Sequence, residues 1–158
     1  MRQISCEEIT ALVEKLCIQA ATVLPDDLCR VIETAEQKEE SPVGKGILQD
    51  ITKNFQMARE KGVPICQDTG MAVVFLTLGQ EVHITGGSLT DAVNLGVHNG
   101  YLNGFLRCSV VGDPLRRENT GDNTPAVLHT EIVPGDGFEI TVAPKGFGSE
   151  NMSRIQML

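Results

Sequence analysis

The pattern of apolar residues changes at Pro64, and this change constrains the fold more than any other feature of the chain. Before Pro64, apolar residues recur at the three- and four-residue spacing of amphipathic helices. After it, Met71–Leu78 reads MAVVFLTL, a short continuous apolar run that is rich in strand-forming residues. We therefore expect a helical N-terminal region, residues 1–62, and an α/β region, residues 63–158.

Capping signals predict the ends of the helices. Ser5 and Glu8 form a capping-box pattern, which predicts a helix from there to about residue 23. A second helix follows Pro25, and a third begins at Ser41-Pro42 and ends at Gly62. The second and third helices carry apolar stripes formed by Leu28, Val31, Ile32 and Ala35, and by Ile47, Leu48, Ile51, Phe55 and Ala58.

The C-terminal region predicts strands around one further helix. A second capping box at Ser88 predicts a helix to about Phe105, with Ala92, Leu95 and Leu102 facing inward. LRCSVV, residues 106–111, is a candidate strand. VLHTEIV and FEITVAP alternate around the turn PGDG, which predicts a β-hairpin near residues 126–143 with one buried face. The expected fold class is mixed α/β (α+β), with the helical N-terminal segment packed on a small mixed sheet.

The charge of the chain excludes several kinds of partner. A formal net charge of −8 disfavours nucleic acid and anionic membranes. No segment approaches the roughly 18 apolar residues of a membrane span, and the first ten residues lack the apolar stretch of a secretory signal. We therefore expect a cytoplasmic protein.

The five cysteines show neither a CxxC pair nor a zinc-like spacing. In the cytoplasm they are expected to be reduced thiols. Cys6, Cys17 and Cys29 lie in helical patterns and are interpreted as buried apolar residues. The sequence does not reveal whether any of these three has a redox role.

The stretch PICQDTG, Pro64 to Gly70, places a thiol, an amide and a carboxylate side by side in a turn. Cys66 could approach a metal there, while Gln67 and Asp68 could orient a polar ligand. The plainer alternative is a surface turn with an incidental cysteine. A nucleophilic Cys66 is disfavoured because none of the three histidines shares a motif with it.

Two other stretches could bind an anion. Arg107 in LRCS could hold a carboxylate with two hydrogen bonds, although a solvated arginine explains it equally well. KGFGSEN combines a lysine with a glycine-rich turn at a predicted helix start, where backbone N–H groups suit an anion. NTGDN, residues 119–123, is equally ambiguous. Together these residues suit a metal-assisted reaction on a small carboxylate.

In this order PICQDTG, LRCS, NTGDNTPA and KGFGSEN resemble the alpha subunit of the iron–sulfur (class I) fumarate hydratase and L-tartrate dehydratase family. The resemblance runs from about residue 40 to residue 154. It implies reversible dehydration of L-malate to fumarate, a step of the tricarboxylic acid cycle. It also implies a [4Fe–4S] cluster held by three cysteines, whose open iron acts as a Lewis acid.

The resemblance also implies roles for individual residues. Cys66 matches a cluster ligand, and Gln67, Asp68, Arg107 and Gly148 match residues that bind the small dicarboxylate substrate. Two positions depart from the family pattern, since Phe147 replaces a glycine and Cys108 replaces a tyrosine, and both could alter the pocket.

The other two cluster cysteines and the catalytic base are expected outside this chain, in a later part of the subunit or in a beta subunit or C-terminal domain. The chain is thus interpreted as an incomplete fragment of a longer subunit that is inactive alone and oligomeric when complete. L(+)-tartrate dehydratase is the close alternative, and a non-catalytic interaction module is the alternative of another class.

Overall fold

The computed structural model describes residues 2–148 and 154–157. Its elements are β1 (Arg2–Ser5), α1 (Cys6–Thr22), α2 (Asp26–Lys38), α3 (Pro42–Lys61), β2 (Met71–Gly79), β3 (Val82–Thr85), α4 (Leu89–Asn103), β4 (Val127–Val133) and β5 (Phe138–Lys145). This arrangement is the mixed α/β class that the sequence predicts. Within the described residues, none of the helices has both the length and the apolar character needed to cross a membrane.

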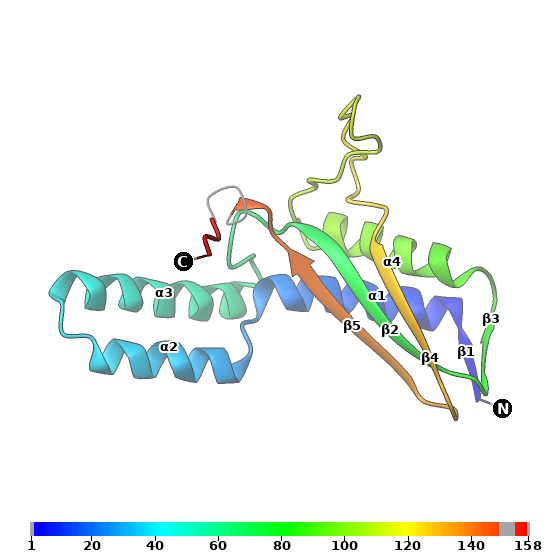
Figure 1. Ribbon diagram of the computed structural model, residues 1–158, viewed down its shortest axis with the longest axis horizontal. Helices are drawn as coiled ribbons and strands as arrows, with labels where there is room; N and C mark the ends of the chain where they lie inside the picture. The colour runs from blue at the N-terminus through cyan, green and yellow to red at the C-terminus, as the bar shows by residue number, and fades with distance from the viewer. Residues whose placement is uncertain (1, 149–153, 158) are drawn as a thin grey trace.

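The strand β2 lies at the centre of a three-stranded sheet of order β4-β2-β5 (Figure 1). It pairs in parallel with β4 and antiparallel with β5, so that Val74 lies between Leu128 and Val142. The short strands β1 and β3 form a separate parallel pair. The most apolar strand of the chain therefore takes the position that is buried most completely.

The predicted β-hairpin near residues 126–143 is wrong in its pairing. Both strands form, but β2 lies between them. The end of β2 is held inside the turn that joins β4 to β5, since Gly79 N donates to Gly137 O at 2.7 Å and Gln80 N donates to Val133 O at 2.9 Å. Alternation of apolar and polar residues indicates that a strand has two unlike faces, but it does not indicate which strand lies beside it.

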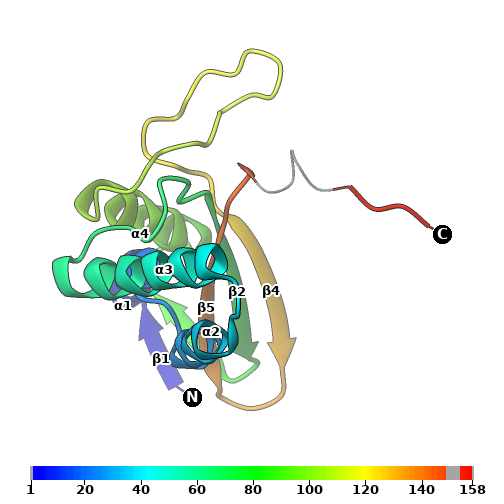
Figure 2. The same cartoon turned by 90° about the vertical axis from the view of Figure 1, so that its left-hand side faces the viewer.

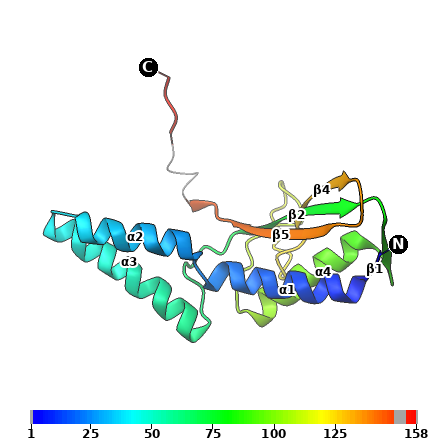
Figure 3. The ribbon, with the colours of Figure 1, turned by 90° about the horizontal axis from the view of Figure 1, so that it is seen from below.

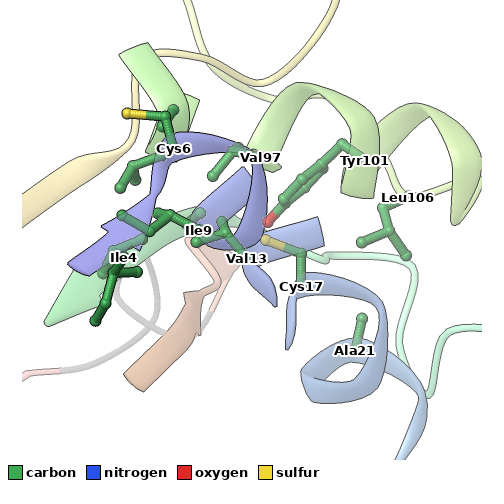
Figure 4. Close-up of a cluster of buried hydrophobic side chains, with 13 residues drawn as sticks. Ile4, Cys6, Ile9, Val13, Cys17, Ala21, Val97, Tyr101 and Leu106 are labelled. Atoms are coloured by element: carbon green, nitrogen blue, oxygen red, sulfur yellow. The ribbon is translucent and has the colours of Figure 1, made fainter. Parts of the chain in front are cut away.

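The helices α1 and α4 pack on each other and cover one face of this sheet (Figures 2 and 3). Ile9, Val13, Val97 and Tyr101 meet between them and are almost fully buried (Figure 4). Ala72 and Val74 of β2 close the core from the sheet side. On the opposite face Phe75 stacks on His129, with ring centroids 5.1 Å apart, and remains half exposed.

Two glycines of α4 permit this close packing. A Cβ on Gly96 would lie 2.6 Å from Val13 Cβ and 2.7 Å from Thr10 O, and one on Gly100 would lie 2.8 Å from Cys17 Cβ. Both distances to carbon are far below van der Waals contact, so α1 and α4 approach each other closely only because these positions have no side chain.

Gly96→Ala is expected to lower the free energy of unfolding by about 1–3 kcal/mol, because the added methyl group must separate α1 from α4. Gly46→Ala in α3 is the matched control, since a Cβ there meets nothing within 4 Å. It is expected to raise that free energy by about 0.5–1 kcal/mol through helix propensity. Urea titration of both variants measures the difference, and equal effects would contradict the close approach.

The remaining helices form a separate projection. α2 and α3 pack side by side and extend away from the sheet (Figure 1). Cys29, Phe55 and Ala58 are buried between the helices or at their base, whereas much of the predicted apolar stripes is exposed to solvent. The exposed members are Leu28, Val31, Ala35, Ile47 and Ile51.

Other differences from the sequence predictions are local. The capping boxes place the starts of α1 and α4 correctly, but Leu95 and Leu102 are exposed and not inward-facing. Residues 106–111 form no strand. β1 and β3 were not anticipated, because four mixed residues are too few to show a period. The helix start predicted in the last ten residues falls mainly on residues 149–153, outside the described part, and residues 154–157 have no regular structure.

Candidate functional site

The CQDTG turn connects the end of α3 to the start of β2. α3 ends at Gly62 in the left-handed conformation that a helix C-cap favours. The following segment is anchored because Ile65 N donates to Ala21 O at 2.9 Å and Asn54 Nδ2 donates to Ile65 O at 2.8 Å. Two helices thereby set the position of Cys66.

Beyond this anchor the turn is open to solvent. Cys66 and Gln67 are both exposed. Cys66 lies at the rim of a small cavity of about 130 Å³, which Asp68, Thr69 and Pro144 also line. Its thiol is thus accessible from outside the fold.

Asp68 joins the turn to the KGFG loop that follows β5. Its Oδ2 accepts hydrogen bonds from Phe147 N at 2.8 Å and Gly148 N at 3.0 Å, and its Oδ1 accepts one from Gly70 N at 3.1 Å. The backbone N–H groups of Phe147 and Gly148, aided by the charge of Arg107, lower the pKa of this carboxyl. Asp68 is therefore held as a carboxylate at neutral pH.

Gly148, predicted from the resemblance to face the substrate, lies beside Asp68. Its N–H group donates to the Asp68 carboxylate. The glycine-rich loop does present backbone donors to an anion, as its composition predicts, and in this structure the anion is a side chain of the same chain.

Arg107 is brought to the same turn through Thr69. The buried Thr69 hydroxyl accepts a hydrogen bond from Arg107 N at 2.9 Å and donates one to Arg107 O at 3.1 Å. The backbone of Arg107 is thus fixed to the residue next to Asp68. Arg107 itself is exposed and makes no ion pair shorter than 4.0 Å within the described part of the chain.

Two buried residues that sequence reasoning missed support the turn from below. Tyr101 Oη donates to Thr69 O at 3.1 Å and to Gly70 O at 3.3 Å, and Asn123 Nδ2 donates to Gly70 O at 3.0 Å. Burial raises the pKa of Tyr101, so its hydroxyl remains a neutral donor. The available signals were weak: Tyr101 is the only tyrosine in the chain, and Asn123 stands in the ambiguous NTGDN stretch.

His98 and Asp122 form a further pair at the edge of the site. His98 Nδ1 and Asp122 Oδ2 are 3.0 Å apart, and Asp122 Oδ1 accepts from the backbone N and the hydroxyl of Thr124. Burial alone would raise the pKa of Asp122, but these hydrogen bonds outweigh it and lower the pKa to about 2. The pair ties α4 to the loop that carries Asn123.

The carboxyl carbon of Asp122 is expected to titrate by NMR with a midpoint of about 2, against an ordinary value of 3.8. Because the pKa is lowered in the folded state, the stability contributed by the carboxylate is present above pH 3.8 and is lost as the pH falls through about 2. His98→Ala should move the midpoint up toward 3.8. A midpoint at the ordinary value in the parent protein would contradict the paired geometry.

The described residues do not by themselves fit an iron–sulfur cluster. A cluster needs several thiolates, and within residues 2–148 and 154–157 no group of three metal-ligating side chains comes together. Cys6, Cys17 and Cys29 are buried in helices, as predicted, and Cys108 is half-buried. Burial raises the pKa of Cys17 to about 12, which further disfavours a thiolate there. Cys66 is the exposed thiol of the chain.

The four motifs that meet at this turn match one known family. A model of the family described as Fumarate hydratase (Fumerase) matches residues 10–158. The chain belongs to this family. The resemblance stated on the motifs is therefore confirmed, and it extends further toward the N-terminus than the motifs themselves do.

Relatives of this family carry two kinds of name. A Methanocaldococcus jannaschii protein named as an L(+)-tartrate dehydratase alpha subunit is 36% identical over 157 residues, covering 96% of this chain and 55% of its own length. The aerobic class I fumarate hydratase of Escherichia coli K12 is 32% identical, covering 97% of this chain and 28% of its own length. The L(+)-tartrate dehydratase alpha subunit of Escherichia coli O157:H7 is 27% identical over 99% of this chain and 52% of its own length.

The chain thus spans about half the length of the tartrate dehydratase subunits and about a quarter of the length of the fumarate hydratase.

Proposed function

We propose that this chain is part of an iron–sulfur hydro-lyase that reversibly dehydrates L-malate to fumarate in the cytoplasm. The observation that carries the proposal is the pair of hydrogen bonds from Phe147 and Gly148 to Asp68, which joins CQDTG to KGFG. Arg107 is attached to the same turn through Thr69. The five free cysteines agree with a reducing compartment.

Each residue of the turn has a role in this proposal. The exposed guanidinium of Arg107 binds one carboxylate of the dicarboxylate substrate with two parallel hydrogen bonds. Gln67, exposed in the same turn as Cys66 and Asp68, offers both a donor and acceptors to the substrate. Asp68 is held ionised and oriented by backbone donors, so it binds the substrate as an acceptor of hydrogen bonds. The N–H group of Gly148 lies at the same point and orients this carboxylate.

Cys66 supplies one ligand of a [4Fe–4S] cluster in the proposal. The other two ligands and the catalytic base come from outside this chain, which makes the chain an N-terminal part of a longer subunit. Among the described residues Cys66 is the exposed cysteine, and no group of three metal-ligating side chains comes together. Alone, the chain is expected to be inactive.

The rest of the enzyme has an apolar surface to cover. α2 and α3 expose Val31, Val43 and Ile47, and the outer sheet face exposes Phe75. Exposed apolar patches of this kind mark protein–protein contacts. We propose that a beta subunit or C-terminal domain packs there in an oligomer, and that the helical region, residues 1–62, and the α/β region, residues 63–158, belong to one catalytic half.

L(+)-tartrate dehydration is the second candidate, because tartrate dehydratase alpha subunits are the relatives of which this chain covers about half. The complete enzyme, assembled anaerobically from the whole subunit and its partner, tests both candidates. Faster turnover of L-malate than of L-tartrate supports the fumarate hydratase, and the reverse supports the dehydratase. Turnover of neither substrate would favour a non-catalytic interaction module.

A further inference from the structure

We propose that Asn123 is a positioning residue that fixes the segment of Arg107 relative to the CQDTG turn, so that both bind one dicarboxylate. The inference rests on the proposed function, because it concerns the spacing of Asp68 and Arg107, which are proposed there to bind the substrate. Asn123 lies in the NTGDNTPA motif, and the resemblance implies no role for it. It touches neither Cys66 nor the proposed substrate.

Asn123 is the most deeply buried polar side chain of the described residues, with 0% of its surface exposed. Its φ of 62° places it in the left-handed region, which asparagine tolerates better than most residues. A buried carboxamide is costly unless its hydrogen bonds are made. Asn123 is therefore a buried polar residue in an uncommon backbone conformation. The hydrogen bonds of its side chain offset the cost of burying it.

The carboxamide connects two segments that are far apart in sequence. Its Oδ1 accepts from Ser109 N at 2.7 Å and from Val110 N at 3.1 Å, and its Nδ2 donates to Gly70 O at 3.0 Å. The side chain thus bonds the backbone of the segment that follows Arg107 to the backbone of the CQDTG turn.

Both ends of this connection lie two residues from the site. Ser109 follows Arg107 by two positions, and Gly70 follows Asp68 by two positions. Thr69 makes a parallel connection between Asp68 and Arg107. Together the two side chains fix how far the backbone of Arg107 lies from the turn that carries Asp68. A shift between two groups that bind one substrate weakens the binding of that substrate.

Asn123→Gly is the first variant to test, because glycine adopts the left-handed conformation freely and only the carboxamide is lost. Gly121→Ala is the matched control in the same loop. Gly121 has a φ of 80° and a Cβ there meets nothing within 4 Å, so this change strains the loop without removing a contact of Asn123.

In the complete enzyme, Asn123→Gly is expected to raise KM for L-malate about 10-fold, the effect of about 1.4 kcal/mol of lost hydrogen bonding. kcat should fall less, and Gly121→Ala should leave KM within about twofold of the parent. Amide exchange by NMR gives a second readout that needs no activity: Ser109 and Val110 should exchange at least about 10-fold faster in Asn123→Gly only.

Asn123→Asp separates the two ends of the connection and serves if the glycine variant does not fold. It keeps the acceptor for Ser109 and Val110 but replaces the donor to Gly70 O by a second acceptor, so KM should rise while those two amides remain protected. Unchanged KM in the variants that fold would overturn the proposal even if exchange accelerates. Unchanged exchange of Ser109 and Val110 in Asn123→Gly would overturn it as well.

The proposed function can fail separately. If the parent enzyme turns over neither L-malate nor L-tartrate, the hydro-lyase proposal fails, and KM is then replaced by the dissociation constant for fumarate measured by calorimetry. A constant that is equal in the parent and in Asn123→Gly overturns the positioning role. A 10-fold weaker constant in the variant supports it.

Discussion

Gly70→Ala is expected to lower the free energy of unfolding by more than about 3 kcal/mol, the largest stability effect of any single methyl group at the site. Gly70 has a φ of 64°, where an L-residue costs about 1–2 kcal/mol. The added Cβ would also overlap the backbone carbonyl of Lys145 and lie 2.6 Å from Gly146 N. Overpacking against backbone that cannot move adds about 1–3 kcal/mol.

The reason lies in the pairing of β2 with β5. Met71 pairs with Lys145, so the turn before β2 and the KGFG loop after β5 leave the sheet side by side. Gly70 lies against the backbone of Lys145 and Gly146. Because it has no side chain, Asp68 can reach the N–H groups of Phe147 and Gly148. A side chain at Gly70 would therefore separate the two motifs as well as destabilise the fold.

Gly62→Ala separates conformational strain from overlap. Gly62 has nearly the same φ, 63°, but a Cβ there meets nothing within 4 Å. This control should cost only the conformational penalty of about 1–2 kcal/mol. Chemical denaturation of both variants measures the difference, and equal losses would mean that Gly70 does not approach Lys145 as described.

Cys66→Ser is expected to abolish hydro-lyase activity in the complete enzyme while the fold is retained. Cys66 is exposed, so exchanging its sulfur for oxygen removes little packing. Loss of an outer-shell partner of a metal ligand already costs about 10–100-fold, and loss of the ligand itself should cost more. Turnover and the visible absorbance of the purified enzyme should fall together, whereas the cluster-free forms of the parent and the variant should unfold at the same thermal midpoint.

Cys29→Ser is the matched control for this change. Cys29 is buried in α2, with 8% of its surface exposed, and its Sγ lies 3.6 Å from Leu24 O, a contact that a serine hydroxyl can replace. The variant should keep turnover and absorbance at some cost in stability. If Cys66→Ser kept full activity, Cys66 would be an incidental surface cysteine and its assignment as a cluster ligand would be wrong.

The fold was predictable where the signal is local. The capping boxes at Ser5 and Ser88, the cap at Ser41 and the stop at Gly62 all place helix ends correctly. These signals depend on contacts within three or four residues, which the sequence contains entirely. The hairpin was predicted wrongly because strand pairing depends on a third segment, β2, that lies about 50 residues earlier in the chain.

The candidate site divides in the same way. Motif order led to Cys66, Gln67, Asp68, Arg107 and Gly148, and the structure brings Asp68, Arg107 and Gly148 to one turn. Motif order did not lead to Thr69, Tyr101 or Asn123. Their importance lies in hydrogen bonds to backbone atoms, and backbone atoms have the same chemistry at every position of a sequence.

By itself the sequence determined the helices, the strands β2, β4 and β5, and the family, because periodicity, caps and motif order are properties of neighbouring residues. Only the tertiary structure decided that β2 separates β4 from β5 and that Asn123 connects the segment after Arg107 to Gly70. It also decided that Asp68 occupies the backbone donors of the KGFG loop. The physical reason is that a buried polar group must find a partner, and that partner is set by distance in space rather than by distance along the chain.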